Sequence, residues 1–141
     1  MDWLDQLPHQ PPMRLVDEVL EVQPGISATA ARTTRSTDFY FQGHFPGRPI
    51  VPAAILVEMI AQTGGIAAAS VTASNDRPRS GRLAAITGFK FPAAAGADAR
   101  LEIRARVVGR MGRLVKIDGE VLADGVNVAA GSLTLADVGG D

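Results

Sequence analysis

A run of apolar residues from Ala53 to about Ala73 limits most strongly what this chain can fold into. Alanine, leucine, isoleucine, valine and methionine occupy every helical face of the run, and Glu58 is its only charged residue. A helix that is apolar all round is a buried helix. At 1.5 Å per residue it would be roughly 30 Å long, the width of a small domain. Pro52 suits the first turn, where its missing N–H has no partner inside the helix.

The composition of this run argues against a membrane span. Such a span needs about 20 predominantly apolar residues, whereas residues 62–65 are polar or glycine and Glu58 lies within the run. The N-terminus carries acidic residues and prolines where a signal peptide needs basic residues and an apolar stretch. We therefore expect a cytoplasmic protein without membrane association; a membrane span is the less favoured alternative.

Period-two alternation of apolar and polar residues predicts β-strands on both sides of this helix. Pro24 and Gly25 mark a turn in the N-terminal part, and a polar break occupies residues 74–82. Gly109 to Gly112 supplies a later turn, and the pair 124–125, Asp-Gly, is typical of a two-residue hairpin. The predicted strands are 14–22, 26–35, 101–107, 115–123 and 126–138.

One long helix beside five or six antiparallel strands defines an α+β fold in which the sheet wraps around the helix. The 141 residues fit a single domain. A sheet of this size leaves part of the helix and its own edges uncovered, so homodimerisation is the simplest way to bury them.

Composition removes several classes of function. The chain has no cysteine, which excludes a disulfide framework, a thiolate nucleophile and a cysteine zinc site. Its two histidines, His9 and His44, are far apart in the sequence, so nothing indicates a metal site. A net charge of −1 argues against nucleic-acid binding.

His44 and Glu58 are the candidate residues for chemistry. His44 lies in the segment GHFPGRP, whose prolines restrict the backbone around the imidazole, as an orienting site requires. A carboxylate buried without partners is costly, so we expect Glu58 to be paired, neutral or placed at an opening. Structural explanations are also open: a histidine that only packs, which we favour for His9, and a glutamate bonded to a backbone donor or to Arg48.

The start of the helix supplies a third element. Its first N–H groups, near Ala53 and Ala54, have no acceptor within the helix, and together with the helix dipole they favour developing negative charge. A histidine base, N–H donors for an enolate-like oxygen and an acid for the leaving group suit one type of reaction. This is removal of a proton next to a carbonyl, followed by elimination.

The segment FQGHFPGRPIVPAAILVEMIAQ (41–62) resembles the signature of the 3-hydroxyacyl-[acyl-carrier-protein] dehydratases of bacterial type II fatty-acid synthesis. In that family a GHFPG-x-P-x-x-PG loop is followed by a glutamate, and His44 and Glu58 keep the family spacing of fourteen residues. The opening LPHQPPMRLVDEVLEV (7–22) is also similar to the family's. The resemblance covers nearly the whole chain and implies a hot-dog fold, a long central helix wrapped by an antiparallel sheet and paired as a dimer.

By position, the resemblance implies a role for four residues. His44 would be the base, Glu58 the partner carboxylate reaching across the dimer, and the backbone N–H of Ala53 the oxyanion donor, while Gln62 would steady the carboxylate. The substrate would be a 3-hydroxyacyl thioester on the phosphopantetheine of an acyl carrier protein, converted to a trans-2-enoyl thioester without a cofactor. A glutamate at this position is more similar to the dehydratase-only branch, and the dimers could assemble further into a trimer of dimers.

The sequence departs from the family pattern at several positions. Ala53 stands where the family has glycine, and Ala54 replaces a bulkier aliphatic residue. Residues 10–13 and the segment PAAAGAD (92–98) also differ. Because the candidate catalytic residues are intact, we expect these changes to affect the choice of substrate.

Two further questions stay open from the sequence. The arginines of the C-terminal half either form a solvated outer strand face or provide a dock for an acidic carrier protein and its phosphate. The alternatives to a dehydratase are a thioester hydrolase of the same fold, with a water held by Glu58, and a non-catalytic acyl-binding subunit, against which the presence of both His44 and Glu58 argues. The arginines concerned are Arg77, Arg79, Arg82, Arg100, Arg104, Arg106, Arg110 and Arg113.

Overall fold

In the computed structural model, a helix lies across one face of a six-stranded antiparallel sheet with the strand order β1-β2-β4-β5-β6-β3. The structure describes residues 3–6, 10–42, 47, 49–69 and 81–137. The elements are η1 (Trp3–Gln6), β1 (Glu18–Gln23), β2 (Ser27–Thr33), η2 (Phe39–Phe41), α1 (Ala53–Ala69), β3 (Gly81–Lys90), β4 (Arg100–Met111), β5 (Leu114–Ala123) and β6 (Val126–Asp137).

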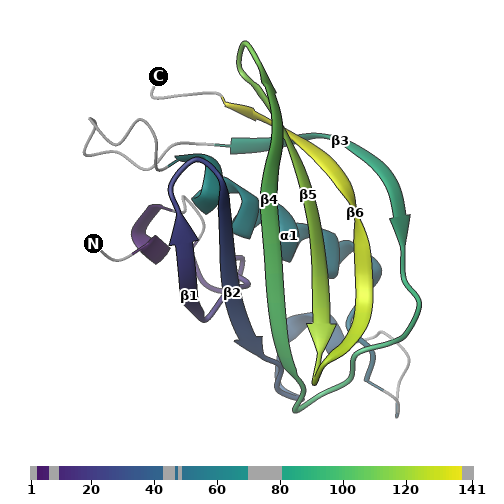
Figure 1. Cartoon of the computed structure of the whole chain (residues 1–141). Coiled ribbons are helices and arrows are strands. Elements are labelled where there is room, and N and C mark those ends of the chain that lie inside the picture. Colours follow the sequence, from purple (N-terminus) through teal and green to yellow (C-terminus); the bar gives the residue numbers. More distant parts are fainter. Residues whose placement is uncertain (1–2, 7–9, 43–46, 48, 70–80, 138–141) are drawn as a thin grey trace.

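The sheet curves around α1, as Figure 1 shows, and the core lies between the two layers. Met59, Ile60 and Ile66 of the helix are fully buried in one cluster with Ile103 of β4 and Ile117 of β5. Burying an aliphatic side chain of this size stabilises a fold by about 1.5–3 kcal/mol. The α+β hot-dog architecture predicted from the sequence is therefore confirmed.

Two glycines allow the helix and the sheet to approach closely. A β-carbon on Gly119 of β5 would overlap the Cγ2 of Ile60, and it would lie 3.0 Å from the carbonyl oxygen of Arg104. On the helix, a β-carbon at Gly64 would lie 3.0 Å from the Cγ2 of Ile117. The backbones of α1 and β5 are thus held at a separation that only glycine permits.

The hairpin turns follow the positions where the backbone must take a positive φ. Asp124 and Gly125 have φ values of 47° and 85° and close the β5–β6 hairpin, as the sequence predicts. The β4–β5 turn, predicted within Gly109 to Gly112, falls at its end: Gly112 takes a φ of 59° and Met111 still pairs with Leu114. Gly109 remains in the strand, beside a bulge.

Several predicted strand boundaries differ from the structure; β4, for example, runs to Met111 instead of residue 107. The first strand begins at Glu18 instead of residue 14, because the amide of Leu15 donates to the Gln62 side chain of α1 (2.9 Å). The second ends at Thr33, because the amide of Thr34 turns to the carbonyl of Ala99 (2.9 Å). The helix is described as far as residue 69, and its predicted end near residue 73 lies outside the described residues.

Strand β3 is an element that the sequence did not predict. It begins where a polar break was expected and forms one edge of the sheet, paired with β6. Residues 84–88 are all exposed, and the Ile86 side chain is 53% exposed. An exposed strand edge with apolar residues is a ready template for pairing with another chain.

Within one chain, helix α1 is not buried on every face, which agrees with the expectation that a sheet of this size leaves part of the helix uncovered. Ala54 is exposed, and Glu58, Gly65 and Ala68 are partly exposed along the same side of the helix. The sheet covers the opposite side, where the large side chains lie. In the described parts of the chain, no helix is both long and apolar enough to span a membrane.

We predict that Gly119→Ala destabilises the protein by about 1–3 kcal/mol, because the added methyl overpacks the contact between α1 and β5. Urea unfolding measures the change. Gly109→Ala is the matched control, since its methyl would meet only the Cβ of Lys116, at an ordinary distance of 3.9 Å. Equal unfolding midpoints for the two variants would contradict the close approach.

Candidate active site

The exposed start of α1 presents backbone N–H groups. The carbonyl of Pro52 accepts hydrogen bonds from the amides of Ile55 (2.9 Å) and Leu56 (3.2 Å) and so opens the helix. The amides of Ala53 and Ala54, two residues before these donors, have no acceptor within the helix, and both residues are exposed. The first turn contains no acidic residue, so no carboxylate of that turn offsets the positive end of the helix dipole.

Glu58 follows one turn later and is partly exposed. Of the three conditions expected for this carboxyl, the structure shows both a hydrogen-bond partner and an opening, since the group is partly exposed at the edge of the apolar layer. Its Oε1 is 3.5 Å from the Nε2 of Gln62, at the outer limit of a hydrogen bond. Because residues four apart share a helix face, Ala54, Glu58 and Gln62 follow one another along α1.

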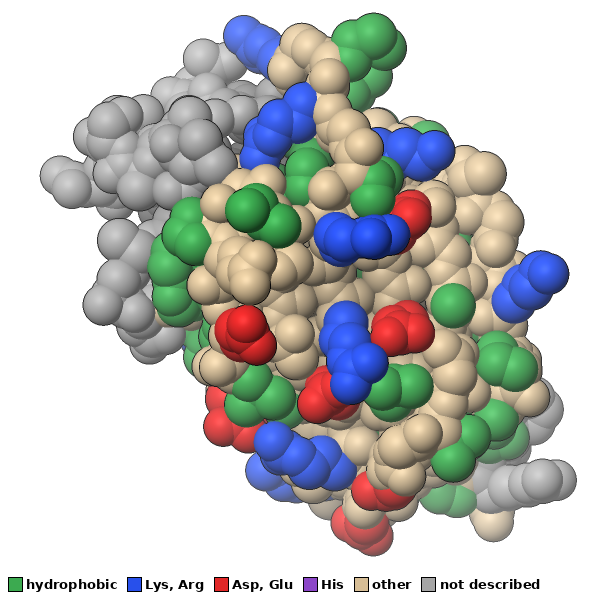
Figure 2. Space-filling view, viewed as in Figure 1, with side chains coloured by type: hydrophobic (Ala, Val, Ile, Leu, Met, Phe, Trp, Pro, Cys, Tyr) green, Lys and Arg blue, Asp and Glu red, His purple; other side chains and the backbone are tan. Residues whose placement is uncertain are grey.

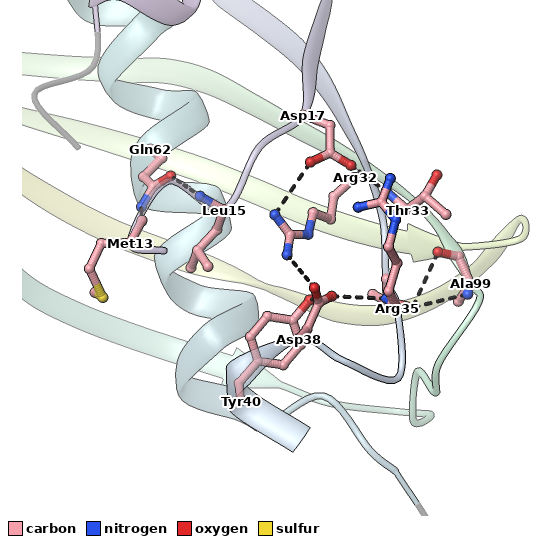
Figure 3. Close-up of polar contacts among 11 residues, drawn as sticks. Met13, Leu15, Asp17, Arg32, Thr33, Arg35, Asp38, Tyr40, Gln62 and Ala99 are labelled. Carbon is pink, nitrogen blue, oxygen red and sulfur yellow. Dashed lines mark hydrogen bonds and ion pairs between the residues drawn. The ribbon is translucent and has the colours of Figure 1, made fainter. Parts of the chain in front are cut away.

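Gln62 has its stronger hydrogen bonds to the backbone of the N-terminal segment. Its Oε1 accepts from the amide of Leu15 at 2.9 Å, and its Nε2 donates to the carbonyl of Met13 at 2.8 Å (Figure 3). The side chain is buried. Gln62 therefore ties residues 13–15 to the helix, and its contact with Glu58 is the longest of the three.

A second group of polar side chains, which the sequence did not single out, lies where β2 ends. We call Asp17, Arg32, Asp38 and Tyr40 the Arg32 cluster. The guanidinium of Arg32 makes ion pairs with Asp17 (3.3 Å) and Asp38 (3.0 Å). Asp38 also accepts hydrogen bonds from the Tyr40 hydroxyl (2.7 Å) and from the amide of Arg35 (2.9 Å) (Figure 3).

The centre of the Arg32 cluster, the pair of Arg32 and Asp38, is largely removed from solvent, whereas Asp17 is exposed. The side chains of Arg32 and Asp38 are each 11% exposed. Burial alone would raise the pKa of Asp38, but the hydrogen bonds from Tyr40 and Arg35 and the charge of Arg32 hold that pKa below its ordinary value. Burial and the hydrogen bond to Asp38 raise the pKa of Tyr40, so its hydroxyl stays a donor.

The chain on both sides of the glycine- and proline-rich motif attaches to the segment 95–99, between β3 and β4. Before the motif, the hydroxyl of Thr34 donates to the carbonyl of Gly96 at 2.7 Å. After the motif, the amide of Val51 donates to the carbonyl of Ala95 at 2.8 Å. The stretch 92–98, which departs from the family pattern, therefore overlaps the segment that fixes both approaches to the motif.

Three of the four predicted site residues are described, and all three lie on α1. Glu58 and Gln62, four residues apart, share one face of the helix, and Ala53 lies at its start. His44 lies outside the described residues, as do His9 and Arg48. Within the described ranges, no group of three or more histidine, cysteine, aspartate or glutamate side chains could hold a metal ion.

Most described arginines of β4 are paired with carboxylates on the outer face of the sheet. Basic and acidic side chains are intermingled there (Figure 2). This arrangement favours a solvated face over a dock for that part of the surface. Arg77 and Arg79 lie outside the described residues. The pairs are Arg100–Glu18 (3.0 Å), Arg104–Glu120 (3.3 Å) and Arg106–Asp118 (3.6 Å), and Arg104 also contacts Glu102.

The basic residues at the β4–β5 turn are arranged differently. Arg110 donates to the carbonyl of Ala68 (3.2 Å), in the last turn of α1. Arg113 occupies the turn itself and is exposed, beside Met111, which is 76% exposed. Among the described residues, docking of an acidic carrier protein thus stays a possible role only for the arginines at this end of the sheet.

The fold and this helix-borne constellation define a class of hot-dog proteins. Residues 7–132 match the family model described as a FabA-like domain, and the chain belongs to that family. The chain is 36% identical over 125 residues to the 3-hydroxyacyl-[acyl-carrier-protein] dehydratase FabZ of a Roseiflexus species, covering 84% of this chain and 86% of that protein. It is 38% identical over 122 residues to the FabZ of Campylobacter hominis, covering 86% and 84%.

Solved structures support the same fold. The dehydratase heterocomplex ApeI:P from Xenorhabdus doucetiae superposes with a TM-score of 0.78 at 17% identity, over 97% of this chain and 91% of that one. A hypothetical thioesterase with coenzyme A from Streptococcus pneumoniae superposes with a TM-score of 0.64 at 15% identity, over 86% and 85%. At these identities the likeness concerns the fold alone.

We predict that Asp38→Asn lowers stability at neutral pH and that the deficit shrinks in acid. Because the folded pKa of Asp38 is below its ordinary value, its stabilisation is present above about pH 4 and is lost as the pH falls through the folded pKa. Urea unfolding of both proteins at about pH 7, 5 and 3.5 measures the difference. A deficit that is constant with pH would contradict this role for the Asp38 charge.

Proposed function

We propose that this protein dehydrates a 3-hydroxyacyl thioester, carried by an acyl carrier protein, to a trans-2-enoyl thioester in fatty-acid or related acyl-chain synthesis. One observation carries the proposal. The carboxyl of Glu58 and the free amide end of α1 share one partly exposed side of a helix whose sequence contains the family motif. The names of the curated relatives support the same reaction.

In the proposed reaction, His44 removes a proton from the carbon next to the thioester carbonyl. The electron pair of that C–H bond forms the new double bond as the C–O bond to the 3-hydroxyl breaks. Glu58 gives a proton to the departing hydroxyl, which leaves as water. His44 then returns its proton to Glu58, through solvent or the released water, so the enzyme ends in its starting state and no cofactor is consumed.

The start of α1 would stabilise the charge that develops on the thioester oxygen. The amide of Ala53 is exposed at the positive end of the helix dipole, where an enolate-like oxygen gains most from a hydrogen bond. An alanine at this position keeps the donor and adds a methyl group near the substrate. We therefore assign Ala53 to the choice of acyl group as well as to the oxyanion.

The site is proposed to be completed by a second copy of this chain. Two surfaces are exposed in the monomer and would be buried in a dimer. They are the edge of β3 around Ile86 and the side of α1 that carries Ala54, Glu58, Gly65 and Ala68. Pairing of two β3 edges would continue the sheet and bring the two helices together. Glu58 of one protomer would then act with His44 of its partner. A further assembly of three such dimers, a trimer of dimers, is compatible with this arrangement.

The proposed partner is an acidic acyl carrier protein. Since the arginines on the face of β4 are paired, the end of the sheet at the β4–β5 turn is the better dock: Arg113 is exposed there beside the apolar side chain of Met111. An acidic helix with an apolar side chain would complement this combination.

We predict that His44→Ala and Glu58→Gln each lower kcat by about 10²–10⁴-fold, because one group takes and the other gives the proton of the reaction. The assay follows the enoyl thioester absorbance with carrier-linked and coenzyme A-linked 3-hydroxyacyl substrates of several lengths. Glu18→Gln is the matched control, since Glu18 is exposed on the opposite layer and pairs with Arg100. Normal rates in both site variants would overturn the dehydratase assignment.

The same assay separates the alternatives. Release of free thiol in place of an enoyl product would identify a thioester hydrolase, and binding without turnover would identify a non-catalytic subunit. Mixing the two inactive variants under conditions of subunit exchange should restore activity, since a mixed dimer contains one site with both residues intact. Failure in verified mixed dimers would place both residues in one protomer.

We predict that Ile86→Lys dissociates the dimer and lowers activity in parallel, because a charge on the β3 edge opposes strand pairing. Light scattering over a range of concentrations gives the mass. Val126→Lys is the matched control: this side chain is 57% exposed, against 53% for Ile86, but lies at the β5–β6 turn. A dimeric, active Ile86→Lys protein would show that the interface lies elsewhere.

A further inference from the structure

The Arg32 cluster is built differently from the salt bridges on the sheet. Arg100, Arg104 and Arg106 make exposed pairs, whereas Arg32 and Asp38 are about nine-tenths buried. The Nε of Arg32 is buried and finds no hydrogen-bond acceptor among the described residues. A buried ion pair with an unsatisfied donor contributes little net stability, and replacing both partners together is often neutral. Stability alone thus gives little reason for this cluster.

The cluster lies directly before the motif. Asp38 gathers three donors, from Arg32, Tyr40 and Arg35, on one carboxylate. The carbonyl of Asp38 then accepts from the amide of Phe41 at 3.1 Å, and the carbonyl of Phe39 accepts from the amide of Gln42 at 3.2 Å. The guanidinium therefore holds a turn, residues 35–42, that ends two residues before His44.

Hydrogen bonds also fix the position of this turn relative to the start of α1. At its upstream end, Thr34 is fully buried and bonded to the 95–99 segment through its hydroxyl and its amide. A carbonyl group of that segment also accepts a hydrogen bond from the amide of Val51, two residues before Ala53. On the other side, Arg32 reaches Asp17, whose second oxygen accepts from the amide of Thr33 at 2.9 Å. The cluster thus fixes the turn relative to the amide end of the helix.

We propose that Arg32 is a positioning residue for the dehydration: through Asp38 it fixes residues 35–42, the turn from which the chain runs into the motif that carries His44. This inference rests on the proposed function and adds to it a residue that contacts neither the substrate nor the reacting atoms. Misplacement of a reacting group by about 1 Å can cost a hundredfold in rate. An arginine that is weakly stabilising but geometrically demanding suits this role, because its planar fork binds two carboxylates at fixed angles.

The decisive variant removes both charges at once. In Arg32→Met/Asp38→Asn no uncompensated charge is left buried, and the asparagine oxygen still accepts from Tyr40 or Arg35. We expect a urea unfolding midpoint equal to or above that of the wild type, with kcat lowered about tenfold to a hundredfold and KM changed less than about twofold. Arg32→Lys alone should keep more of the wild-type kcat than the double variant does, because lysine retains the positive charge but lacks the planar guanidinium. Arg100→Met is the matched control, an exposed arginine pair that should leave kcat unchanged.

Hydrogen exchange supplies a readout that does not depend on turnover. The amides of Phe41 and Gln42 should exchange faster in the double variant, while that of Ile103 in the core of β4 should not change. A double variant with wild-type kcat overturns the inference, and so does a kcat that falls only in proportion to the unfolded fraction. If the wild type itself fails to dehydrate any substrate, the proposed function fails. Unchanged exchange at Phe41 and Gln42 would then overturn the anchoring separately.

Discussion

Helix α1 lies against β5 so closely that a β-carbon at Gly119 would overlap a methyl group of Ile60, and the remaining structure is arranged around this contact. It places the large side chains of the helix in the core and turns Ala54, Gly65, Ala68 and Glu58 to the other side. Any lift of the helix would open the layer around Ile117 and displace the amide end of the helix together with Glu58. Packing energy and placement of the site are therefore consequences of the same approach.

Polar groups then fix the segments that the apolar layer leaves free. Gln62 holds the N-terminal segment at Met13 and Leu15, and Thr34 and Val51 hold the two approaches to the motif on the stretch 95–99. These bonds join parts of the chain that are distant in sequence, and several of them are buried. Buried polar groups are costly when left without partners, so each such pair specifies one arrangement of its segments and penalises others.

Local signals explain which parts of the fold could be predicted from the sequence. The start of α1 follows from Pro52 and the apolar run, and the β5–β6 hairpin from Asp124 and Gly125, since both depend on residues adjacent in the chain. The helical periodicity also predicts that Glu58 and Gln62 share one face, with Ala53 at the start of the same helix. Strand β3 escaped prediction because an edge strand exposed on both faces has no alternating pattern. The Arg32 cluster was not predicted because its charged residues are separated in the sequence and form ion pairs only in the folded chain.

The pairing of charges on the outer face of β4 has a consequence for how charged molecules approach the protein. Two opposite charges a few ångströms apart produce a field that fades far faster than that of one charge, and salt screens what is left beyond about 8 Å. The broad sheet face, with Arg104 and Arg106 neutralised by their neighbours, therefore exerts little pull at long range. At the β4–β5 turn, by contrast, Arg113 is exposed and Arg110 donates to a backbone carbonyl of α1, so this end of the sheet attracts an anionic molecule over a longer range than the paired face does.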